Sequence, residues 1–404
     1  MIVGAGAAGL ATAIFTRRLN PSRPVILLDG ATRPGAKILV SGGARCNVTN
    51  ATVTERDFFG GKSTVVRRVL RGFPVADTID WFADLGVPLH EEDHGKLFPD
   101  TNRARDVLDA LLREVGACGA ELRSATRVTG VTPESGGFRL STPRGTIHAT
   151  DVVLATGGQS LPKTGSDGMG LEIARRLGHT IVPTTPALVP LTLAAIHAQL
   201  SGVAHDVVVT VWVDGAVVER LSGALLWTHF GVSGPVVLNA SRLWLRARLE
   251  QRATRITVNF CPGDSFERVD TRWTTLASAR PRASVLHALA ETLPASVAAA
   301  LVQALGIDGS LQLAHFARVA RRRLARALVE WPLDVTGSRG YNYAEATAGG
   351  VALDEVDPAT LASRRCPGLY LVGEMLDVDG RIGGFNFQWA WSSGRVAARA
   401  LARR

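Results

Sequence analysis

The feature that most constrains this chain is a short apolar strand, residues 1–3, that runs directly into the glycine-rich turn Gly4–Gly9 and the amphipathic stretch Leu10–Leu19. In such a strand–turn–helix the first glycine permits the tight turn, the second lets a pyrophosphate approach the backbone, and the third lets helix and strand pack closely. The next apolar run, Val25–Leu28, ends in Asp29, where a carboxylate can reach a ribose diol. These residues predict a Rossmann-type dinucleotide site.

Two more apolar strands end in glycine much later in the chain. Residues 151–158 read DVVLATGG, and residues 369–374 read LYLVGE, followed by Asp377 and then by Gly383–Asn386 at the start of a final helix. A nicotinamide-linked dehydrogenase carries one such junction, whereas three junctions indicate one long ligand that distant segments contact. FAD is the ligand that fits this pattern; the alternative is three unrelated turns.

Chain length and a change in composition predict two domains. The 404 residues exceed the range of a single core. After Pro183–Pro186 the sequence becomes β-rich, with Val207–Val213 before an Asp-Gly turn, and residues 283–330 are helical and rich in alanine. We expect an α/β fold: a discontinuous Rossmann-type FAD-binding domain, residues 1–186 and 348–404, interrupted by a β-rich substrate-side domain with a small helical portion, residues 187–347.

The net charge of +9 raises the question of a nucleic-acid partner. Only four of the 45 basic residues are lysines, and the chain is rich in alanine, which indicates a coding bias. The densest cluster, Arg318–Arg326, has helical spacing with apolar residues between the arginines, and this favours a solvated helix face. We therefore expect a small-molecule substrate and no nucleic acid.

Cysteine spacing and hydropathy bear on the compartment. The four cysteines form no CxxC pair, so neither a zinc site nor a disulfide framework is indicated. No apolar run is both long and clean enough to span a bilayer, and the first residues are already a strand. We expect a cytoplasmic protein without a membrane segment.

Five further stretches of the sequence are distinctive: residues 35–47, 97–99, 155–158 with 164–168, 228–235, and 373–390. Through these motifs the chain resembles the BaiN-like (YhiN-like) family of FAD-dependent oxidoreductases, over nearly its whole length. One departure is Ala44, where the family usually has a third glycine. The resemblance implies an FAD domain interrupted by a β-rich domain, and a reaction on an organic acceptor, such as reduction of an activated C=C bond.

Several residues have predicted roles at the cofactor. Lys37 and Arg45 can neutralise the charge of a pyrophosphate; the alternative is that both are ordinary surface cations. Asp377 can accept a hydrogen bond from a hydroxyl of the ribityl chain. The helix that begins at residues 384–386 is expected to direct its N-terminus at the flavin N1–C2=O edge, where its dipole stabilises negative charge. The predicted cofactor-binding residues are Gly4, Ala5, Gly6, Ala8, Gly9, Asp29, Lys37, Ser41, Gly42, Arg45, Cys46, Asn47, Val128, Ala155, Thr156, Gly157, Gly373, Glu374, Asp377, Gly383, Gly384, Phe385 and Asn386.

His229 is the candidate general acid, because it lies among small residues and a positioned histidine titrates near neutrality. A buried histidine satisfied by the backbone is the alternative. Cys46 has no second cysteine within 70 residues to form a redox pair, which favours a packing role. The histidines of His90–His94 fall in a predicted polar loop, and we expect no metal site.

The function expected from these residues is an FAD-dependent oxidoreductase that passes hydride through flavin N5 between NAD(P)H and an unidentified organic substrate. Because no second GxGxxG is present, NAD(P)H is expected to bind as a transient reductant. Two alternatives stay open: a basic flavoprotein that acts on structured RNA, of the tRNA-modifying type, and a flavin-binding protein without turnover.

Overall fold

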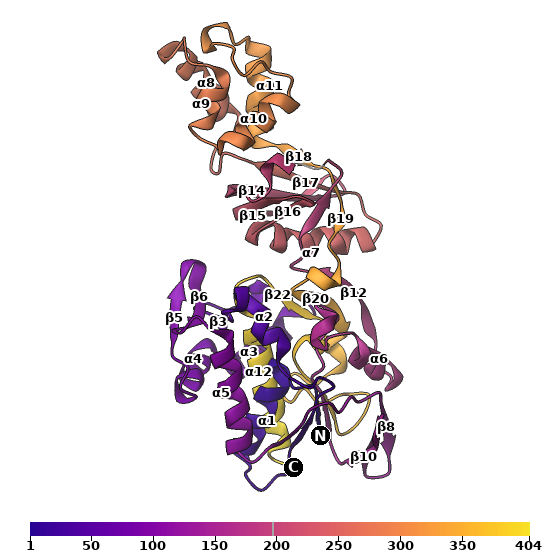
Figure 1. The fold of residues 1–404 in the computed structure, drawn as a ribbon. Helices are drawn as coiled ribbons and strands as arrows, with labels where there is room; N and C mark the ends of the chain where they lie inside the picture. Colours follow the sequence, from indigo (N-terminus) through magenta and orange to yellow (C-terminus); the bar gives the residue numbers. More distant parts are fainter. Residues whose placement is uncertain (196–197) are drawn as a thin grey trace. The chain divides into compact units, whose positions relative to one another are not determined.

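The computed structural model describes residues 1–195 and 198–404, which form two compact units (Figure 1). Unit 1 comprises Met1–Ala187 and Tyr341–Arg404, and unit 2 comprises Leu188–Gly340. The chain re-enters unit 1 ahead of Ala348, because the short 3-10 turn Tyr341–Tyr343 and strand β20 (Ala346–Val351) both belong to it. Among the described residues, every helix is too short or too polar to cross a membrane.

A five-stranded parallel sheet forms the centre of unit 1, in the order β21-β11-β1-β2-β7. Ile2 of β1 lies opposite Leu27 of β2 on one side and opposite Val153 of β11 on the other. In both neighbouring strands, the second residue is therefore aligned with the first residue of β1. The side chains of β1, β11 and β21 are all buried, as are those of Leu27 and Leu28, which explains the continuous apolar runs in these strands. The strands are β1 (Ile2–Val3), β2 (Ile26–Leu28), β7 (Glu121–Arg123), β11 (Val152–Leu154) and β21 (Leu369–Leu371).

Helices α1 (Ala7–Leu19) and α12 (Phe385–Leu401) lie side by side, which joins the two ends of the chain (Figure 1). Gly394 makes this close approach possible, since a Cβ there would lie 3.0 Å from the Ala8 carbonyl oxygen. Trp389 anchors α12 by donating from its indole nitrogen to the Gly373 carbonyl (3.0 Å). The final helix is therefore part of the core around the first strand.

The rest of unit 1 is built from helices and small antiparallel sheets. These elements are α2 (Ala36–Ala44), α3 (Ser63–Gly72), α4 (Val75–Asp84), α5 (Ala104–Ala117), α6 (Met169–Arg176), β3 (Thr49–Asn50) with β6 (Lys96–Pro99) and β5 (Leu89–Glu92), β4 (Phe58–Gly60) with β22 (Val378–Gly380), β8 (Gly130–Glu134) with β9 (Gly137–Thr142) and β10 (Gly145–Ala149), and β12 (Ile181–Ala187) with β20. The predicted loop at residues 90–94 is wrong, because His90–Glu92 pairs with β6 as part of β5.

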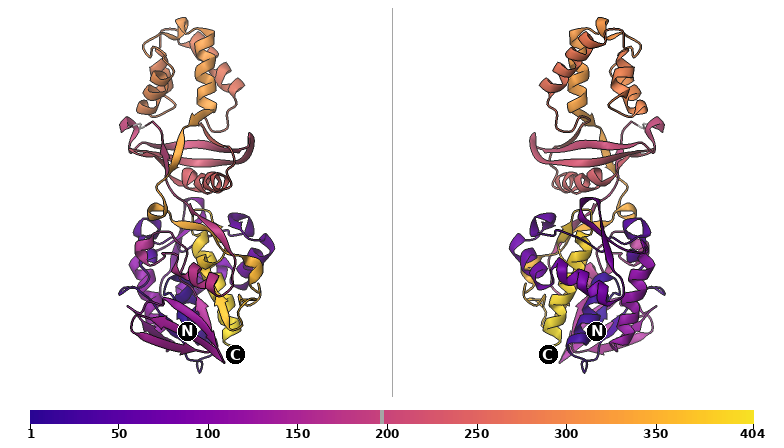
Figure 2. Two further views of the ribbon diagram at one scale, coloured as in Figure 1. Left: turned by 90° about the vertical axis from the view of Figure 1, so that its right-hand side faces the viewer. Right: turned by 90° about the vertical axis from the view of Figure 1, so that its left-hand side faces the viewer.

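Unit 2 contains a seven-stranded antiparallel sheet in the order β18-β17-β14-β15-β16-β13-β19. The predicted hairpin at Asp214-Gly215 is confirmed, since Val213 pairs with Ala216. Helix α7 packs against the sheet, and α8 to α11 gather on its other side (Figure 2). The elements are β13 (Leu191–Leu193), β14 (Ala204–Val213), β15 (Ala216–Thr228), β16 (Gly231–Ser233), α7 (Pro235–Leu249), β17 (Thr254–Asn259), α8 (Phe266–Ala279), α9 (Val285–Ala290), α10 (Ala295–Ala304), α11 (Arg318–Val329), β18 (Trp331–Leu333) and β19 (Val335–Ser338).

Candidate functional site

The three glycine junctions meet at the carboxyl ends of β1, β11 and β21, which are neighbours in the parallel sheet. Gly4 has φ +102°, and a Cβ there would lie 2.5 Å from the Ala155 carbonyl oxygen. A Cβ on Gly9 would lie 1.9 Å from the Gly4 carbonyl oxygen, and one on Gly373 would lie 2.7 Å from the Cβ of Ala8. These glycines are therefore required by contacts between the three junctions.

Gly6 differs from these glycines because its surroundings are open. It is the N-cap of α1 with φ −83°, a conformation that any residue adopts. An added Cβ would meet no atom of the described residues within 4 Å. The first N–H groups of a helix have no acceptor within the helix and attract anions. The space at Gly6 is thus suited to a phosphate group at the start of α1.

Asp29 is held beside this turn by the backbone. Its carboxylate accepts the N–H of Ala5 through one oxygen (2.7 Å) and the N–H of Ala31 through the other (2.8 Å). An ionised carboxylate has about four acceptor positions, so capacity for a hydroxyl donor is left. The geometry fits the predicted contact with a ribose diol.

Lys37 and Glu374 join helix α2 to the segments that follow β11 and β21. The Lys37 ammonium donates to the Ser160 hydroxyl (2.5 Å) and to Glu374 Oε2 (2.6 Å), while Glu374 Oε1 accepts the backbone N–H of Thr347 (2.7 Å). Sequence reasoning missed Ser160 and Thr347, since neither carries a charge or belongs to a glycine junction. This ion pair holds the segments together across one edge of the sheet.

Arg45 also has a carboxylate partner. It donates to Glu92 (2.6 Å), and its guanidinium lies over the Phe98 ring, 4.0 Å from the ring centroid. Because Lys37 and Arg45 are both paired within the protein, their role in neutralising a pyrophosphate stays a prediction. The N–H groups in the first turn of α1 are the other candidate donors for that group.

The segment that contains Lys37, Ser41 and Arg45 includes helix α2, which is broken near its end. Ser41 has extended dihedrals, and Gly42, Gly43 and Ala44 all have positive φ, the last of them +67°. The Ser41 hydroxyl donates to the Ile38 carbonyl (2.7 Å), which closes the helical part before the break. A left-handed backbone at residue 44 gives a physical reason for glycine at this place in the resembling family.

Ala44→Gly is expected to raise the free energy of unfolding by about 0.5–1 kcal/mol. The left-handed conformation costs an L-residue roughly 1–2 kcal/mol, and the greater freedom of glycine in the unfolded chain offsets part of that gain. Urea unfolding of the two proteins measures the difference. Ala44→Val is the matched control and should lower stability; an equal loss in both variants would contradict the assignment of strain.

Cys46 is fully buried, and burial raises the pKa of its thiol to about 12, with the Ser41 hydroxyl opposing that rise. The thiol is therefore protonated at neutral pH and is a poor nucleophile. Its φ of +63° adds to the run of left-handed residues near the glycines. The structure assigns Cys46 to packing beneath this turn.

Cys46→Ser is expected to change the rate of flavin reduction by NAD(P)H by less than about tenfold, equivalent to roughly 1.4 kcal/mol of barrier. A protonated, buried thiol without a partner cysteine has no electron-transfer role to lose. Anaerobic stopped-flow absorbance measures the rate. A larger loss with full flavin content would place Cys46 in the chemistry.

The start of α12 is fixed by backbone contacts. Gly384 has φ +93°, and a Cβ there would lie 2.3 Å from the Thr49 carbonyl oxygen. The Asn386 side chain accepts the Gly380 N–H (2.8 Å) and donates to the Gly380 carbonyl (3.0 Å). With its amide nitrogen facing the Thr49 and Leu97 carbonyls, Asn47 accepts the Gly384 N–H (3.1 Å).

The other predicted residues lie around the same sheet edge. Thr156 donates to the Met375 sulfur (2.8 Å), and Gly157 has φ +75°. The Asp377 carbonyl accepts the Gly61 N–H (2.8 Å). Two apolar residues of the predicted set are buried: Val128 lies ahead of β8, and Phe385 meets Phe58 edge-on with ring centroids 6.3 Å apart.

Ser166 is a third residue that sequence reasoning missed. Its hydroxyl is buried and has no hydrogen-bond partner among the described residues. It lies beside Gly157, whose added Cβ would be 2.5 Å from the Ser166 oxygen. A buried hydroxyl without a partner costs roughly 1–3 kcal/mol, so a polar ligand at this place would satisfy it. The orphaned hydroxyl and the open space at Gly6 both fit a long polar cofactor.

His229 occupies the two-residue loop between β15 and β16 in unit 2, and its side chain is exposed. The alternative of a buried histidine satisfied by the backbone is therefore wrong. Its ring meets Phe230 edge-on with centroids 5.1 Å apart, and Arg339 lies 4.4 Å above the Phe230 ring. The catalytic role of His229 stays a prediction.

Within residues 1–195 and 198–404, no three His, Cys, Asp or Glu side chains are grouped so that they could hold a metal ion. His90 instead faces two carboxylates, Glu92 and Asp100, each at 3.4 Å.

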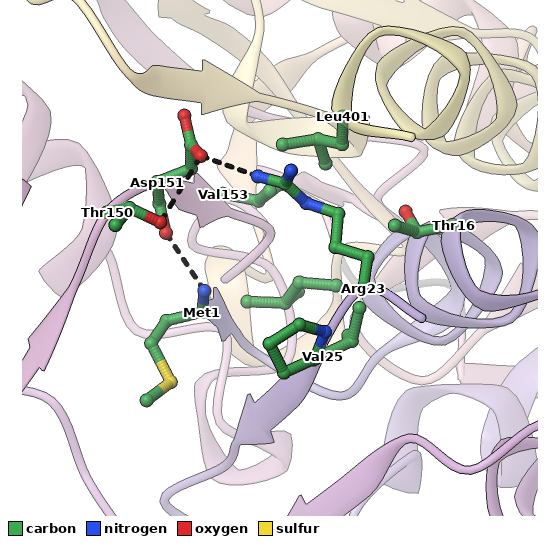
Figure 3. Close-up of a pocket in the computed structure, with 10 residues that line it drawn as sticks. Met1, Thr16, Arg23, Val25, Thr150, Asp151, Val153 and Leu401 are labelled. Carbon is green, nitrogen blue, oxygen red and sulfur yellow. Dashed lines mark hydrogen bonds and ion pairs between the residues drawn. The ribbon is translucent and has the colours of Figure 1, made fainter. Parts of the chain in front are cut away.

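A separate small pocket of about 150 Å³ lies at the start of β1, at the end of the strand away from Gly4 (Figure 3). Asp151 dominates it: its carboxylate binds Arg23 (2.6 Å) and Arg404 (2.7 Å), and its carbonyl accepts the Met1 nitrogen (2.9 Å). The volume is below the 300–1,000 Å³ typical of ligand sites. The ion pairs of this pocket tie chain segments together, and the glycine-lined edge is the candidate site.

A parallel sheet whose strand ends meet in glycine turns, with an acid at the end of the second strand, defines a Rossmann-type dinucleotide-binding protein. A family model described as the HI0933-like protein Rossmann domain matches residues 1–400. The chain belongs to this family, which is the family of FAD-dependent oxidoreductases that its motifs resemble.

Two relatives match over nearly their whole length. Ribosomal RNA dihydrouridine synthase of Escherichia coli (strain K12) is 35% identical over 405 residues, which cover 99% of this chain and 97% of the relative. The 3-dehydro-bile acid delta(4,6)-reductase of Clostridium scindens is 32% identical over 405 residues, 100% of this chain and 98% of the relative. The fold also resembles 3-ketosteroid-delta4-(5alpha)-dehydrogenase from Rhodococcus jostii RHA1, with TM-score 0.51, 14% identity and coverage of 100% and 96%.

Proposed function

We propose that this protein is an FAD-dependent reductase that adds hydrogen across a C=C bond next to a carbonyl group. The observation that carries the proposal is the open space at Gly6, at the one sheet edge where three distant glycine junctions meet. Membership of the family supports the redox class. The NAD(P)H reductant is part of the proposal.

The residues of unit 1 that would hold FAD follow from the geometry. The turn Gly4–Gly9 and the N-terminus of α1 would bind the pyrophosphate, and Asp29 would accept a hydrogen bond from a ribose hydroxyl. The backbone at Gly383–Gly384 would approach the ring, and the Ser166 hydroxyl would gain a partner. When bound, FAD supplies the hydride acceptor and donor of the reaction. His229 is the proposed proton donor to the substrate.

Uridine in RNA is the substrate class that we favour. The names of the two relatives describe reduction of a pyrimidine and of an unsaturated bile acid, which share a C=C bond conjugated to a carbonyl. The net positive charge of unit 2 favours RNA as the substrate over an acidic small molecule. The sequence of unit 2 contains 16 arginines and no lysine against 11 Asp and Glu residues. A basic domain attracts phosphates whatever the base sequence.

The test begins with the absorbance spectrum of the purified protein. We expect a yellow protein whose flavin stays in solution after acid precipitation, because no residue of these motifs is an evident attachment nucleophile. Anaerobic NADH or NADPH should then bleach the flavin, and a uridine-containing RNA stem-loop should restore the colour with formation of dihydrouridine. Absence of bleaching with both nicotinamides would leave a flavin-binding protein without this turnover.

A second candidate is a reductase of small unsaturated ketones, which the bile acid relative favours. The same anaerobic assay separates the two. Reoxidation by a steroid dienone and not by RNA would select the small-molecule reductase, whereas reoxidation by RNA alone would select the RNA enzyme.

A further inference from the structure

We propose that one face of helix α11 in unit 2 is an RNA-binding surface, formed by Arg318, Arg322, Arg323 and Arg326. We name these four residues the α11 arginine face. The inference rests on the proposed function, since it identifies how the proposed RNA substrate is held. It concerns unit 2 alone and does not depend on where the cofactor lies.

Helix α11 has two different sides. Leu324, Ala325 and Leu328 are buried in the core of unit 2, which fixes the orientation of the helix. All four arginines of the α11 arginine face are exposed. Arg318, Arg322 and Arg326 follow each other at intervals of four residues, so their side chains form one row along the helix. The helix contains no acidic residue in its sequence.

The fifth arginine of the helix shows the contrast. Arg321 is only partly accessible and donates to Asp270 of α8 at 3.1 Å. Asp270 lies 4.0 Å from Arg322, and Glu330 lies 3.9 Å from Arg326, at the outer limit of an ion pair. Arg321 therefore ties α11 to α8, whereas the α11 arginine face keeps most of its charge for a partner.

An aromatic ring lies among these cations. The guanidinium groups of Arg322 and Arg326 are 5.2 Å and 4.5 Å from the centroid of the partly exposed Phe266 ring. Such stacking holds flat guanidinium groups in place, where they bind phosphates in a bidentate manner or stack on bases. Arg323 donates to the Leu305 carbonyl, which orients a further side chain.

The charge of this face selects a polyanion. Arg321, Arg322, Arg326 and the neighbouring Arg255 lie near the acids Glu267, Asp270 and Glu330. With Arg318 and Arg323, six arginines of this region stand against three acids. Val319 is 83% exposed beside Arg318, so the patch also offers apolar contact to an unstacked base. Arginine with exposed apolar and aromatic groups is the combination that binds unpaired RNA.

The experiment compares three variants of the full-length holoenzyme in binding to a fluorescent RNA stem-loop with uridines in its loop. One variant replaces Arg318, Arg322, Arg323 and Arg326 by glutamine. The second replaces the same four by lysine. The third is a charge-matched control that replaces exposed arginines of unit 1 by glutamine: Arg105, Arg144, Arg175 and Arg176.

The glutamine variant of the α11 arginine face should bind at least about tenfold more weakly at physiological salt, and its slope of log K against log salt should become shallower by about 3. The lysine variant should keep most of the slope, and the unit 1 control should keep both slope and affinity. All variants should retain FAD and its bleaching by NAD(P)H, which shows that they fold.

Equal losses in the α11 and control variants would overturn the proposal, as would equally tight wild-type binding to duplex DNA or to phosphatidylserine vesicles. Failure of the proposed function gives a different result. If RNA binds through α11 but its uridines are never reduced, the surface stands and the assigned reaction falls.

Discussion

Gly6→Val should abolish retention of FAD while leaving the protein folded. In the described structure an added Cβ at residue 6 meets no protein atom within 4 Å, and φ −83° suits valine, so the protein alone tolerates the change. The branched side chain would instead occupy the space proposed for the pyrophosphate. We expect the affinity for FAD to fall at least about a hundredfold, roughly 2.7 kcal/mol.

The ratio of flavin to protein absorbance after gel filtration measures this loss, and the thermal unfolding of apoprotein checks the fold. Gly9→Ala is the matched control in the same turn. Its Cβ would lie 1.9 Å from the Gly4 carbonyl oxygen, so this smaller substitution should disrupt folding itself. Stoichiometric FAD in Gly6→Val would show that the N-terminal turn is not the cofactor site.

Glu355→Ala is expected to destabilise unit 1 by about 1–3 kcal/mol, the range for leaving buried hydrogen-bond donors without their acceptor. Glu355 is 6% exposed. It accepts the Thr180 N–H (2.8 Å) and hydroxyl (2.9 Å), the Arg365 guanidinium (2.9 Å), and shares a 3.0 Å contact with His179. Loss of the carboxylate leaves these donors without an acceptor, and urea unfolding measures the cost.

The same carboxylate should also determine how steeply the free energy of unfolding falls at acidic pH. Although burial opposes ionisation, the hydrogen bonds from Thr180, Arg365 and His179 lower the pKa of Glu355 to about 2. A folded pKa below the unfolded value means that this stabilisation is complete above about pH 4.5 and is lost as the pH falls toward 2. Burial also lowers the pKa of His179, although Glu355 opposes that shift, so protonation of His179 below about pH 6.5 acts in the same direction.

Glu355→Gln should therefore flatten the fall in stability between about pH 4.5 and pH 2. Glu172→Gln is the control, because Glu172 is a solvent-accessible partner of Arg176 (3.0 Å) on α6, and a pair of this kind contributes little to stability. An acid limb that is as steep in Glu355→Gln as in the wild type would assign the pH dependence to other groups.

The sequence predicted the parallel sheet and its glycine-lined edge because those signals are local. A run such as Val152–Leu154 followed by glycine identifies a buried strand and its turn, and parallel strands end at the same edge of a sheet. Three junctions of one kind were therefore enough to predict that distant segments meet. The position of Asp29 followed from the same rule.

Contacts between side chains far apart in sequence could not be predicted in this way. Lys37 and Glu374 are 337 positions apart, and nothing in either segment indicates that they form an ion pair. Ser160 and Ser166 are ordinary polar residues until the fold brings one to Lys37 and leaves the other without a partner. The sequence predicts a loop at His90–Glu92, because a short polar strand carries no alternation of apolar residues.

The antiparallel pair β12–β20 has a consequence for how such chains diversify. Ala187, the last residue of unit 1 before unit 2, pairs with Ala346, near the point where the chain returns. The two points where unit 2 joins unit 1 thus lie opposite each other on one two-stranded sheet. A segment inserted there can be lengthened, shortened or exchanged without shifting any strand of the parallel sheet. During evolution, recombination at this single location can therefore replace the inserted domain while the Rossmann-type domain is kept unchanged.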